Sequence, residues 1–119
     1  MKKINAYIKA KDKNIADLVI FSTENMKERT KGLLALPTLK KSQGLLLNRC
    51  RSVHTMGMPY TIDVIYLTKK NKIIKIVSSL KPYRMSACIF ANRTLEMLAG
   101  EAERLSLSTG MTLHLPNNH

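Results

Sequence analysis

Residues 61–80 are the segment that most limits the folds open to this chain. Two runs rich in β-branched residues, TIDVIYL and IIKIVSSL, flank the short polar stretch TKKNK. Such runs around a Lys-Asn turn are typical of a β-hairpin. The segment therefore predicts two adjacent antiparallel strands, the second of which ends before Lys81-Pro82.

The rest of the chain continues this pattern of short strands. In INAYIKA, residues 4–10, apolar and polar side chains alternate, as they do in a half-buried strand. Further strands are expected in DLVIF, GLLLN, RSVHTM, CIFA, TLEML and MTLHL, which are residues 17–21, 44–48, 51–56, 88–91, 94–98 and 111–115.

Helical signals are few. Ser22 or Thr23 can cap a helix whose first turn carries Glu24 and which Pro37 ends. A brief helix is expected in GEAERL, residues 100–105. We therefore predict a mainly β fold, a compact β-barrel or sandwich-like single domain over residues 1–119 with one or two short helices.

The net charge of +12, from 20 Lys and Arg against 8 Asp and Glu, suggests a polyanionic partner such as nucleic acid or an anionic membrane surface. The lysines are dispersed, however, and two Phe, four Tyr and no Trp offer few platforms for stacking bases. A bias towards Lys, Ile and Asn is also what an AT-rich genome produces in any protein. A basic accessory protein that associates with nucleic acid through its lysines is therefore an alternative and not the leading hypothesis.

The ends and cysteines of the chain point to an ordinary cytoplasmic protein. The basic N-terminus lacks the apolar stretch of a secretory signal, and no apolar run is long enough for a transmembrane segment. Cys50 and Cys88 are too few to predict a disulfide framework, and no CxxC pair suggests zinc. We expect reduced thiols, no cofactor and no metal.

Asp63 is the one carboxylate within the apolar run TIDVIYL. Because a bare buried charge costs several kcal/mol, it must be paired or hydrogen-bonded. One hypothesis is structural: Asp63 fixes the TMGMP turn through backbone N–H groups of residues 55–58, with Arg29 or His54 as a positive partner. The other hypothesis is a ligand-binding or catalytic role.

Cys50, His54 and Asp63 suggest an enzymatic alternative. With a bulge or turn they could form a nucleophile set or a three-ligand metal site, as in a small hydrolase or metal-assisted enzyme. On a regular strand, however, residues 50 and 54 lie about 13 Å apart, too far to share a proton or a metal. His54 then is an ordinary partly buried histidine.

The order of the motifs KERTKGLL, GLLL, VHTMGMPYTIDVIYL and TLEMLAGEAERLSLSTGMTL resembles the family known as domain of unknown function 192, over about residues 15–115. This resemblance implies a compact β-barrel-like domain of prokaryotes without an established activity; some members carry export signals or sit beside pilus or secretion genes. Most members begin the central motif with Phe-Trp-Met. Here Val53-His54 replaces these aromatics, which removes a lining that could stack a ligand.

These observations favour a non-enzymatic accessory domain that binds a small molecule or a protein. Its candidate ligand-binding residues are Arg29, His54, Met58, Asp63 and Glu96. Glu96 lies between Leu95 and Met97 and so faces away from them. Without a ligand, it is expected to be a charge at the rim of the domain paired with Arg93 or a lysine.

Overall fold

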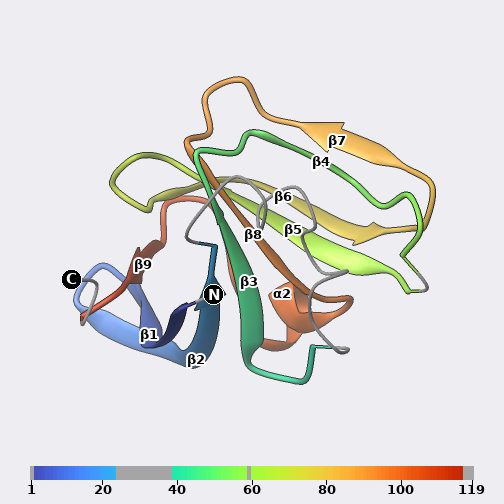
Figure 1. Cartoon of the computed structure of the whole chain (residues 1–119). Helices are drawn as coiled ribbons and strands as arrows, with labels where there is room; N and C mark the ends of the chain where they lie inside the picture. Colours follow the sequence, from blue (N-terminus) through green and yellow to red (C-terminus); the bar gives the residue numbers. More distant parts are fainter. Residues whose placement is uncertain (1, 24–38, 59, 117–119) are drawn as a thin grey trace.

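The computed structural model describes residues 2–23, 39–58 and 60–116 (Figure 1). The predicted helix from Glu24 to Pro37 lies outside the described residues, and Arg29 lies there with it. In the described parts, strands dominate and the single helix is short, so the mainly β prediction is confirmed.

The predicted hairpin is present, and the strands expected in residues 4–10 and 17–21 form a second one. β5 (Ile62–Leu67) pairs antiparallel with β6 (Ile73–Leu80), and Asn71 takes a positive φ of 65° in the turn between them. β1 (Lys2–Ala10) pairs antiparallel with β2 (Lys13–Ser22) around Lys11, whose φ is 57°. β1 and β2 bury alternate residues, whereas every residue of β5 is buried.

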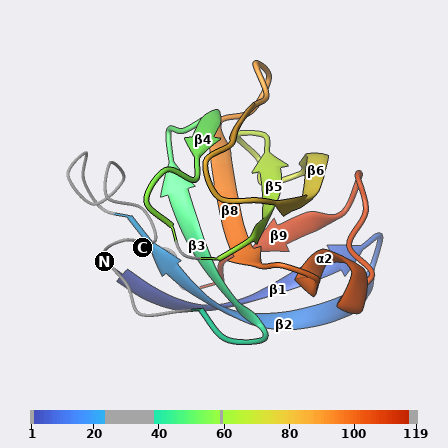
Figure 2. The same ribbon diagram turned by 90° about the vertical axis from the view of Figure 1, so that its right-hand side faces the viewer.

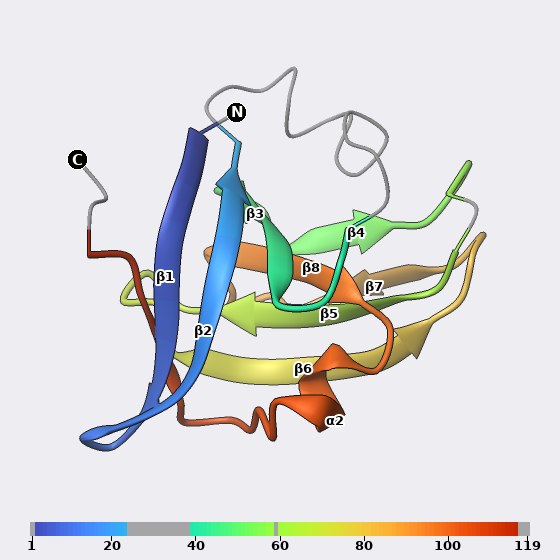
Figure 3. The same ribbon diagram turned by 90° about the horizontal axis from the view of Figure 1, so that it is seen from below.

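The hairpins belong to one seven-stranded sheet with the order β6-β5-β8-β3-β2-β1-β9. Its remaining strands are β3 (Gln43–Asn48), β8 (Arg93–Leu98) and β9 (Thr112–His114). β3 runs parallel to β2 and antiparallel to β8. β1 and β2 run across the direction of β5, β6 and β8, which gives a sandwich-like fold (Figures 2 and 3). A bridge between Lys72 and Thr112 ties the start of β6 to β9 without closing a barrel.

A separate two-stranded ribbon lies over this sheet (Figure 1). It pairs β4 (Ser52–His54) with β7 (Met85–Ala87). The prediction of a strand in residues 88–91 was wrong, because the strand β7 lies three residues earlier. The backbone of residues 88–91 forms a turn instead, in which the Ala91 N–H donates to the Cys88 carbonyl at 3.0 Å. The apolar Ile89 and Phe90 suggested a buried strand, yet both are exposed.

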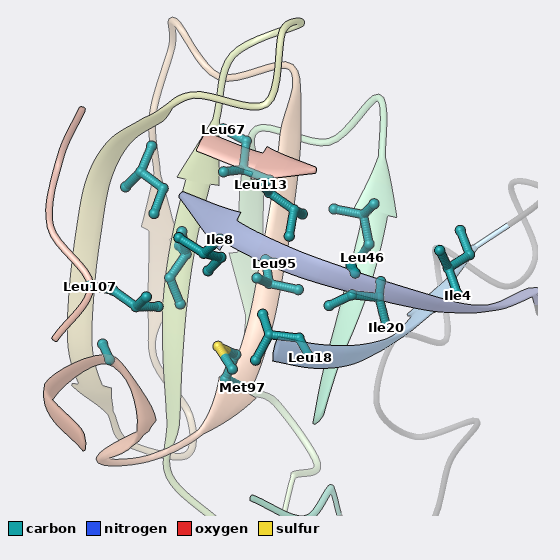
Figure 4. Packing of buried hydrophobic residues seen from close by; sticks show 14 residues of the cluster. Ile4, Ile8, Leu18, Ile20, Leu46, Leu67, Leu95, Met97, Leu107 and Leu113 are labelled. Carbon is teal, nitrogen blue, oxygen red and sulfur yellow. The ribbon is translucent and has the colours of Figure 1, made fainter. Parts of the chain in front are cut away.

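The sheet has an apolar cluster on each face. The inner core lies between β1–β2 and the strands β5 and β8 (Figure 4). Gly44 of β3 permits close packing there, because a Cβ at this position would lie 2.6 Å from Leu95 Cδ1. The second cluster, here called the ribbon core, lies on the opposite face towards β4 and β7; it includes Leu39, Leu45, Leu47, Val53, Met58, Ile62, Val64, Tyr66, Leu80 and Ala91.

The helix α2 (Glu101–Arg104) follows β8 directly, close to where the sequence predicts it. Gly100 enters it with a φ of 93°, a left-handed conformation that glycine adopts at no steric cost. The Glu101 carboxylate accepts hydrogen bonds from Arg104 and from the Ser42 backbone N–H, which anchors α2 to the start of β3. The bond from Arg104 is the main cause of a lowered pKa at Glu101. Within the described parts of the chain, no helix is long and apolar enough to cross a membrane.

Candidate functional site

Asp63 is a fully hydrogen-bonded carboxylate in the middle of the structure. Its side chain is 1% exposed. Oδ1 accepts the Ser79 N–H at 2.9 Å, and Oδ2 accepts the N–H groups of Gly100 and Ala102 at 3.0 and 2.9 Å. Asp63 therefore connects β5 to the end of β6 and to the turn that begins α2.

These partners change the structural hypothesis for Asp63. The TMGMP turn that we expected Asp63 to fix is held by Thr55 instead. The Thr55 hydroxyl donates to the Lys81 carbonyl at 2.6 Å and accepts the Arg84 N–H at 2.8 Å. Asp63 lies in β5 on the side of Ile65, facing the inner core, whereas the turn adjoins the ribbon core.

Glu96 is the second buried carboxylate, and it differs from Asp63 in having an unpaired oxygen. Its side chain is 3% exposed, and Oε1 has no hydrogen-bond partner in the part of the chain that the structure describes. Glu96 pairs with Leu45 on β3 and with Val64 on β5, so it points into the ribbon core with their side chains. A central strand with apolar neighbours on both sides thus carries an ionisable group.

Burial raises the pKa of Glu96 to about 7. Desolvation is the cause, because an apolar environment disfavours the charged form. At neutral pH the carboxyl group is therefore close to half protonated. Such a group responds strongly to any nearby donor or cation, which would stabilise its charged form.

Tyr60 supplies a second unpaired polar atom near Glu96. Among the described residues its buried hydroxyl oxygen has no hydrogen-bond partner. Burial raises the pKa of Tyr60, a contact with the Leu39 backbone that falls short of hydrogen-bond geometry lowers it, and the charge of Glu96 raises it further. We call Glu96 Oε1 and the Tyr60 hydroxyl, together with the apolar side chains around them, the Glu96 niche.

The prediction that Glu96 is a charge at the rim of the domain, paired with Arg93 or a lysine, was wrong because its side chain is buried. Arg93 donates from Nε to Asn48 Oδ1 at 3.0 Å, and from Nη1 to the Lys69 carbonyl and Asn71 Oδ1, each at 2.8 Å. It joins β8 to the end of β3 and to the β5–β6 turn. The expectation failed because TLEML alternates as a half-buried strand does, whereas both faces of β8 are covered.

The other candidate ligand-binding residues separate in the structure. Met58 is buried in the ribbon core, on the same face of the sheet as Glu96. His54 lies on β4 opposite Met85, with its side chain exposed. Asp63 faces the inner core, and Arg29 lies outside the described residues. Of the five candidates, the structure brings Met58 and Glu96 to one face.

The enzymatic set of Cys50, His54 and Asp63 does not come together. Cys50 is partly buried beside the ribbon core, where its thiol donates to the Ser52 carbonyl at 3.0 Å. His54 is exposed, and both oxygens of Asp63 are occupied on the other face of the sheet. Among the residues that the structure describes, no group of three His, Cys, Asp or Glu side chains could hold a metal ion.

A hollow of about 360 Å³ lies on the outer side of β1 and β2, beside Ser42 and Pro116. None of the sequence-predicted candidates lines it. Its carboxylate, Asp17, accepts a hydrogen bond from Asn14 Nδ2 at 3.2 Å. The hollow therefore lacks the unpaired buried polar atoms that set the Glu96 niche apart.

Sequence reasoning did not select Tyr60. A tyrosine after a proline in a loop carries no chemical signature of its own. Its position inside the motif VHTMGMPYTIDVIYL, three residues before Asp63, was the available signal.

Comparison with known proteins places the chain in a family. The family model DUF192, described as an uncharacterised ACR, matches residues 7–115. The chain belongs to the DUF192 family. The resemblance identified from the sequence motifs is thereby confirmed. No curated protein matches this DUF192 domain.

Two crystal structures share the DUF192 fold seen here. A Sinorhizobium meliloti 1021 protein, whose name proposes a role as a transcription regulator, superposes with a TM-score of 0.84 at 20% identity, covering 96% of this chain and 94% of that one. A protein of unknown function from Novosphingobium aromaticivorans DSM 12444 gives a TM-score of 0.77 at 17% identity, covering 94% and 84%. At these identities the likeness concerns the fold alone.

Proposed function

We propose that this DUF192 domain is a non-enzymatic binding domain whose site is the Glu96 niche. The observation that carries the proposal is a pair of buried polar atoms on one apolar face, Glu96 Oε1 and the Tyr60 hydroxyl, neither of which has a hydrogen-bond partner among the described residues. Buried polar groups in proteins nearly always have partners, and those without one call for an explanation. A bound ligand that supplies the missing hydrogen bonds is that explanation.

The chemistry of the niche selects a ligand class. Glu96 in its charged form accepts hydrogen bonds and does not donate them, whereas the Tyr60 hydroxyl can do either. A group with several N–H donors and a positive charge, such as an amine or a guanidinium, complements both atoms. The apolar surroundings, including Met58, Leu45 and Val64, would pack against the carbon atoms that carry this group.

Binding of such a group would be linked to pH. Glu96 has a pKa of about 7 in the free domain, and a cation beside it would stabilise the charged carboxylate. Affinity for the cation should therefore increase as the pH rises through 7, and binding should release a proton below that pH.

The first test is an NMR titration with methylguanidinium and methylamine at about pH 6 and about pH 8, on either side of the Glu96 pKa. We expect amide shifts centred on Tyr60, Val64 and Glu96, with tighter binding at the higher pH. Glu96→Gln should weaken binding about tenfold or more, because the charge-assisted bond is lost. Glu103→Gln is the matched control, since it removes an exposed carboxylate.

Two results would contradict the proposal. Equal binding of acetate and methylguanidinium would show that the niche does not select donors. Shifts that survive unchanged in Glu96→Gln would place the site elsewhere. Glu96→Gln can be checked for folding by its dispersed amide spectrum.

The pKa of Glu96 also favours a second candidate function, general acid–base catalysis. A carboxyl group with a pKa of about 7 is suited to proton transfer at neutral pH. This candidate predicts hydrolysis of an activated ester such as p-nitrophenyl acetate, with a rate that follows an ionisation near pH 7 and is lost in Glu96→Gln. Hydrolysis at the same rate in wild type and variant would exclude it for this ester class.

A further inference from the structure

The ribbon of β4 and β7 carries an exposed apolar surface. We define the ribbon patch as the large hydrophobic side chains that the structure shows exposed there: Met56 (44%), Tyr83 (65%), Met85 (74%), Ile89 (72%) and Phe90 (84%). All five belong to β7 or to the turns that flank the ribbon. Large exposed apolar side chains confined to one element of the fold mark an interaction surface more often than ones scattered over the whole surface do.

The patch is fixed to the body of the protein. At one end, the Tyr83 N–H donates to the Thr55 carbonyl at 3.2 Å, which places Tyr83 beside the turn that holds Met56. In the middle, Ser86 accepts a hydrogen bond of 2.8 Å from the buried Tyr66 hydroxyl. At the other end, the Cys88 N–H donates to the Arg51 carbonyl at 2.9 Å, next to Ile89 and Phe90. The exposed side chains therefore sit on a tethered strand pair.

Basic side chains lie along the ribbon patch. Arg51 Nη1 donates to the Ile89 carbonyl at 3.5 Å, and Arg84 Nη1 donates to the Tyr83 carbonyl at 3.4 Å. Lys75 Nζ donates to the Ala87 carbonyl at 3.0 Å, and Lys81 is exposed just before Tyr83. Each of these cations thus lies beside an apolar residue or the strand of the patch.

Between residues 39 and 98, the described part of the chain that includes the ribbon, no acidic side chain is exposed. Residues 39–98 contain eleven basic residues, namely Lys40, Lys41, Arg49, Arg51, Lys69, Lys70, Lys72, Lys75, Lys81, Arg84 and Arg93. The same range contains two acids, Asp63 and Glu96, and both are buried. In this described range, the exposed charged side chains that accompany the ribbon patch are therefore all basic.

We propose that the ribbon patch docks onto the surface of an anionic lipid bilayer. Ile89 and Phe90 would enter the boundary between headgroups and acyl chains, while Arg51, Arg84, Lys75 and Lys81 contact the lipid phosphates. Apolar side chains combined with several basic ones are the two requirements for stable binding to anionic membranes. This surface is separate from the Glu96 niche, which lies beneath the ribbon.

Charge argues against a second copy of the chain as the occupant. Two ribbon patches placed face to face would bring Arg51, Arg84 and their basic neighbours against like charges. Residues 39–98 contain no exposed acid that could pair with them. Single-stranded nucleic acid fits the charge but needs a row of aromatic platforms. Here the aromatic residues are Tyr83 and Phe90, at opposite ends of the ribbon.

Vesicle co-sedimentation tests the proposal. Wild-type protein should bind vesicles of phosphatidylcholine mixed with phosphatidylglycerol and should not bind pure phosphatidylcholine vesicles. Replacing both Ile89→Ser and Phe90→Ser should weaken binding about tenfold or more, because the inserting side chains are lost. Arg51→Gln with Arg84→Gln should weaken it by a similar factor and reduce its salt dependence.

Lys3→Gln with Lys13→Gln is the matched control. It also removes two exposed cations, on β1 and β2, and should leave vesicle binding nearly unchanged. All substituted side chains are exposed, and thermal unfolding of each variant checks that the fold is kept. An equal loss in this control and in the double arginine variant would overturn the proposal in favour of diffuse attraction by the net charge.

Other outcomes would also overturn it. One is the absence of binding to anionic vesicles; another is binding that Ile89→Ser with Phe90→Ser does not change. Displacement of the protein from vesicles by a short oligonucleotide that binds through the same residues would identify nucleic acid as the occupant. Self-association in sedimentation experiments that this double variant abolishes would identify a second copy.

Discussion

Asp63 and Glu96 are buried carboxylates on neighbouring strands, but their surroundings differ in one respect. Asp63 pairs across the sheet with Met97, the residue after Glu96, so the two carboxylates point to opposite faces. Asp63 accepts three backbone N–H groups, whereas Glu96 keeps an oxygen without a partner in the described residues. The first carboxylate holds segments of the fold together, and the second costs stability.

This difference shows how burial alone misleads about function. Both side chains have almost no exposed surface, so exposure does not distinguish the two acids. Hydrogen bonds decide between them: a satisfied carboxylate is a structural connection, and an unsatisfied one with a raised pKa is a candidate for binding. The predictions below compare the two groups directly.

Asp63→Asn should have the largest effect. The amide NH₂ would face backbone N–H donors, so at least one of the three hydrogen bonds would be lost and a buried donor left unpaired. We expect the free energy of unfolding to fall by about 3 kcal/mol. Urea unfolding at neutral pH measures this, with Asp17→Asn, a substitution of an exposed carboxylate on β2, as control. A change in Asp63→Asn as small as that in the control would show that the three bonds contribute little.

Glu96→Gln should act in the opposite direction, and its effect should depend on pH. The folded-state pKa of about 7 lies above the ordinary value of 4.5, so between these values the folded protein holds a proton that the unfolded chain releases. Stability of the wild type should therefore fall as the pH rises from about 4.5 to about 7, by about 3 kcal/mol in total, and stay level above.

The glutamine variant lacks this ionisation. Glu96→Gln and wild type should have similar stability at about pH 4, and the variant should be more stable at about pH 8, by up to about 3 kcal/mol. Urea unfolding at both pH values measures the difference, with the exposed Glu103→Gln as control. If Glu96→Gln were less stable than wild type at the higher pH, the carboxylate would have a stabilising partner and the comparison with Asp63 would fail.

Most of the fold could be predicted from the sequence because its information is local. Alternation in INAYIKA predicts the strand β1, and the turn between TIDVIYL and IIKIVSSL predicts one hairpin, in both cases without reference to the rest of the chain. The error at residues 88–91 came from the same reasoning, since CIFA has the apolar residues of a buried strand. Only the three-dimensional structure reveals that Ile89 and Phe90 lie in an exposed turn.

The candidate site was harder to predict because it depends on contacts between distant segments. The partners of Asp63 come from residues 79, 100 and 102, which the sheet order brings together. For Glu96, the sequence could not tell that the ribbon core covers the second face of β8. Glu96 and Met58 were named from the family motif, while Tyr60 could be found only from the burial of its hydroxyl and the influence of the Glu96 charge on it.

The smallest effect on stability is expected for a pair of tyrosines, which extends the comparison of satisfied and unsatisfied buried groups. Tyr60 and Tyr66 both have buried hydroxyl groups and pKa values raised by burial, but Tyr66 donates to Ser86 at 2.8 Å and Tyr60 has no hydrogen-bond partner within the described chain. Tyr66→Phe should therefore lower the free energy of unfolding by about 1 kcal/mol, because it leaves Ser86 without its partner. Tyr60→Phe removes an unsatisfied hydroxyl and should leave stability unchanged or raise it by up to about 1 kcal/mol. Urea unfolding of the two variants under the same conditions checks this prediction. If both variants lost the same free energy of unfolding, the Tyr60 hydroxyl would have a hydrogen-bond partner in solution. The Glu96 niche would then lack one of the two unpaired polar atoms on which the proposed function rests.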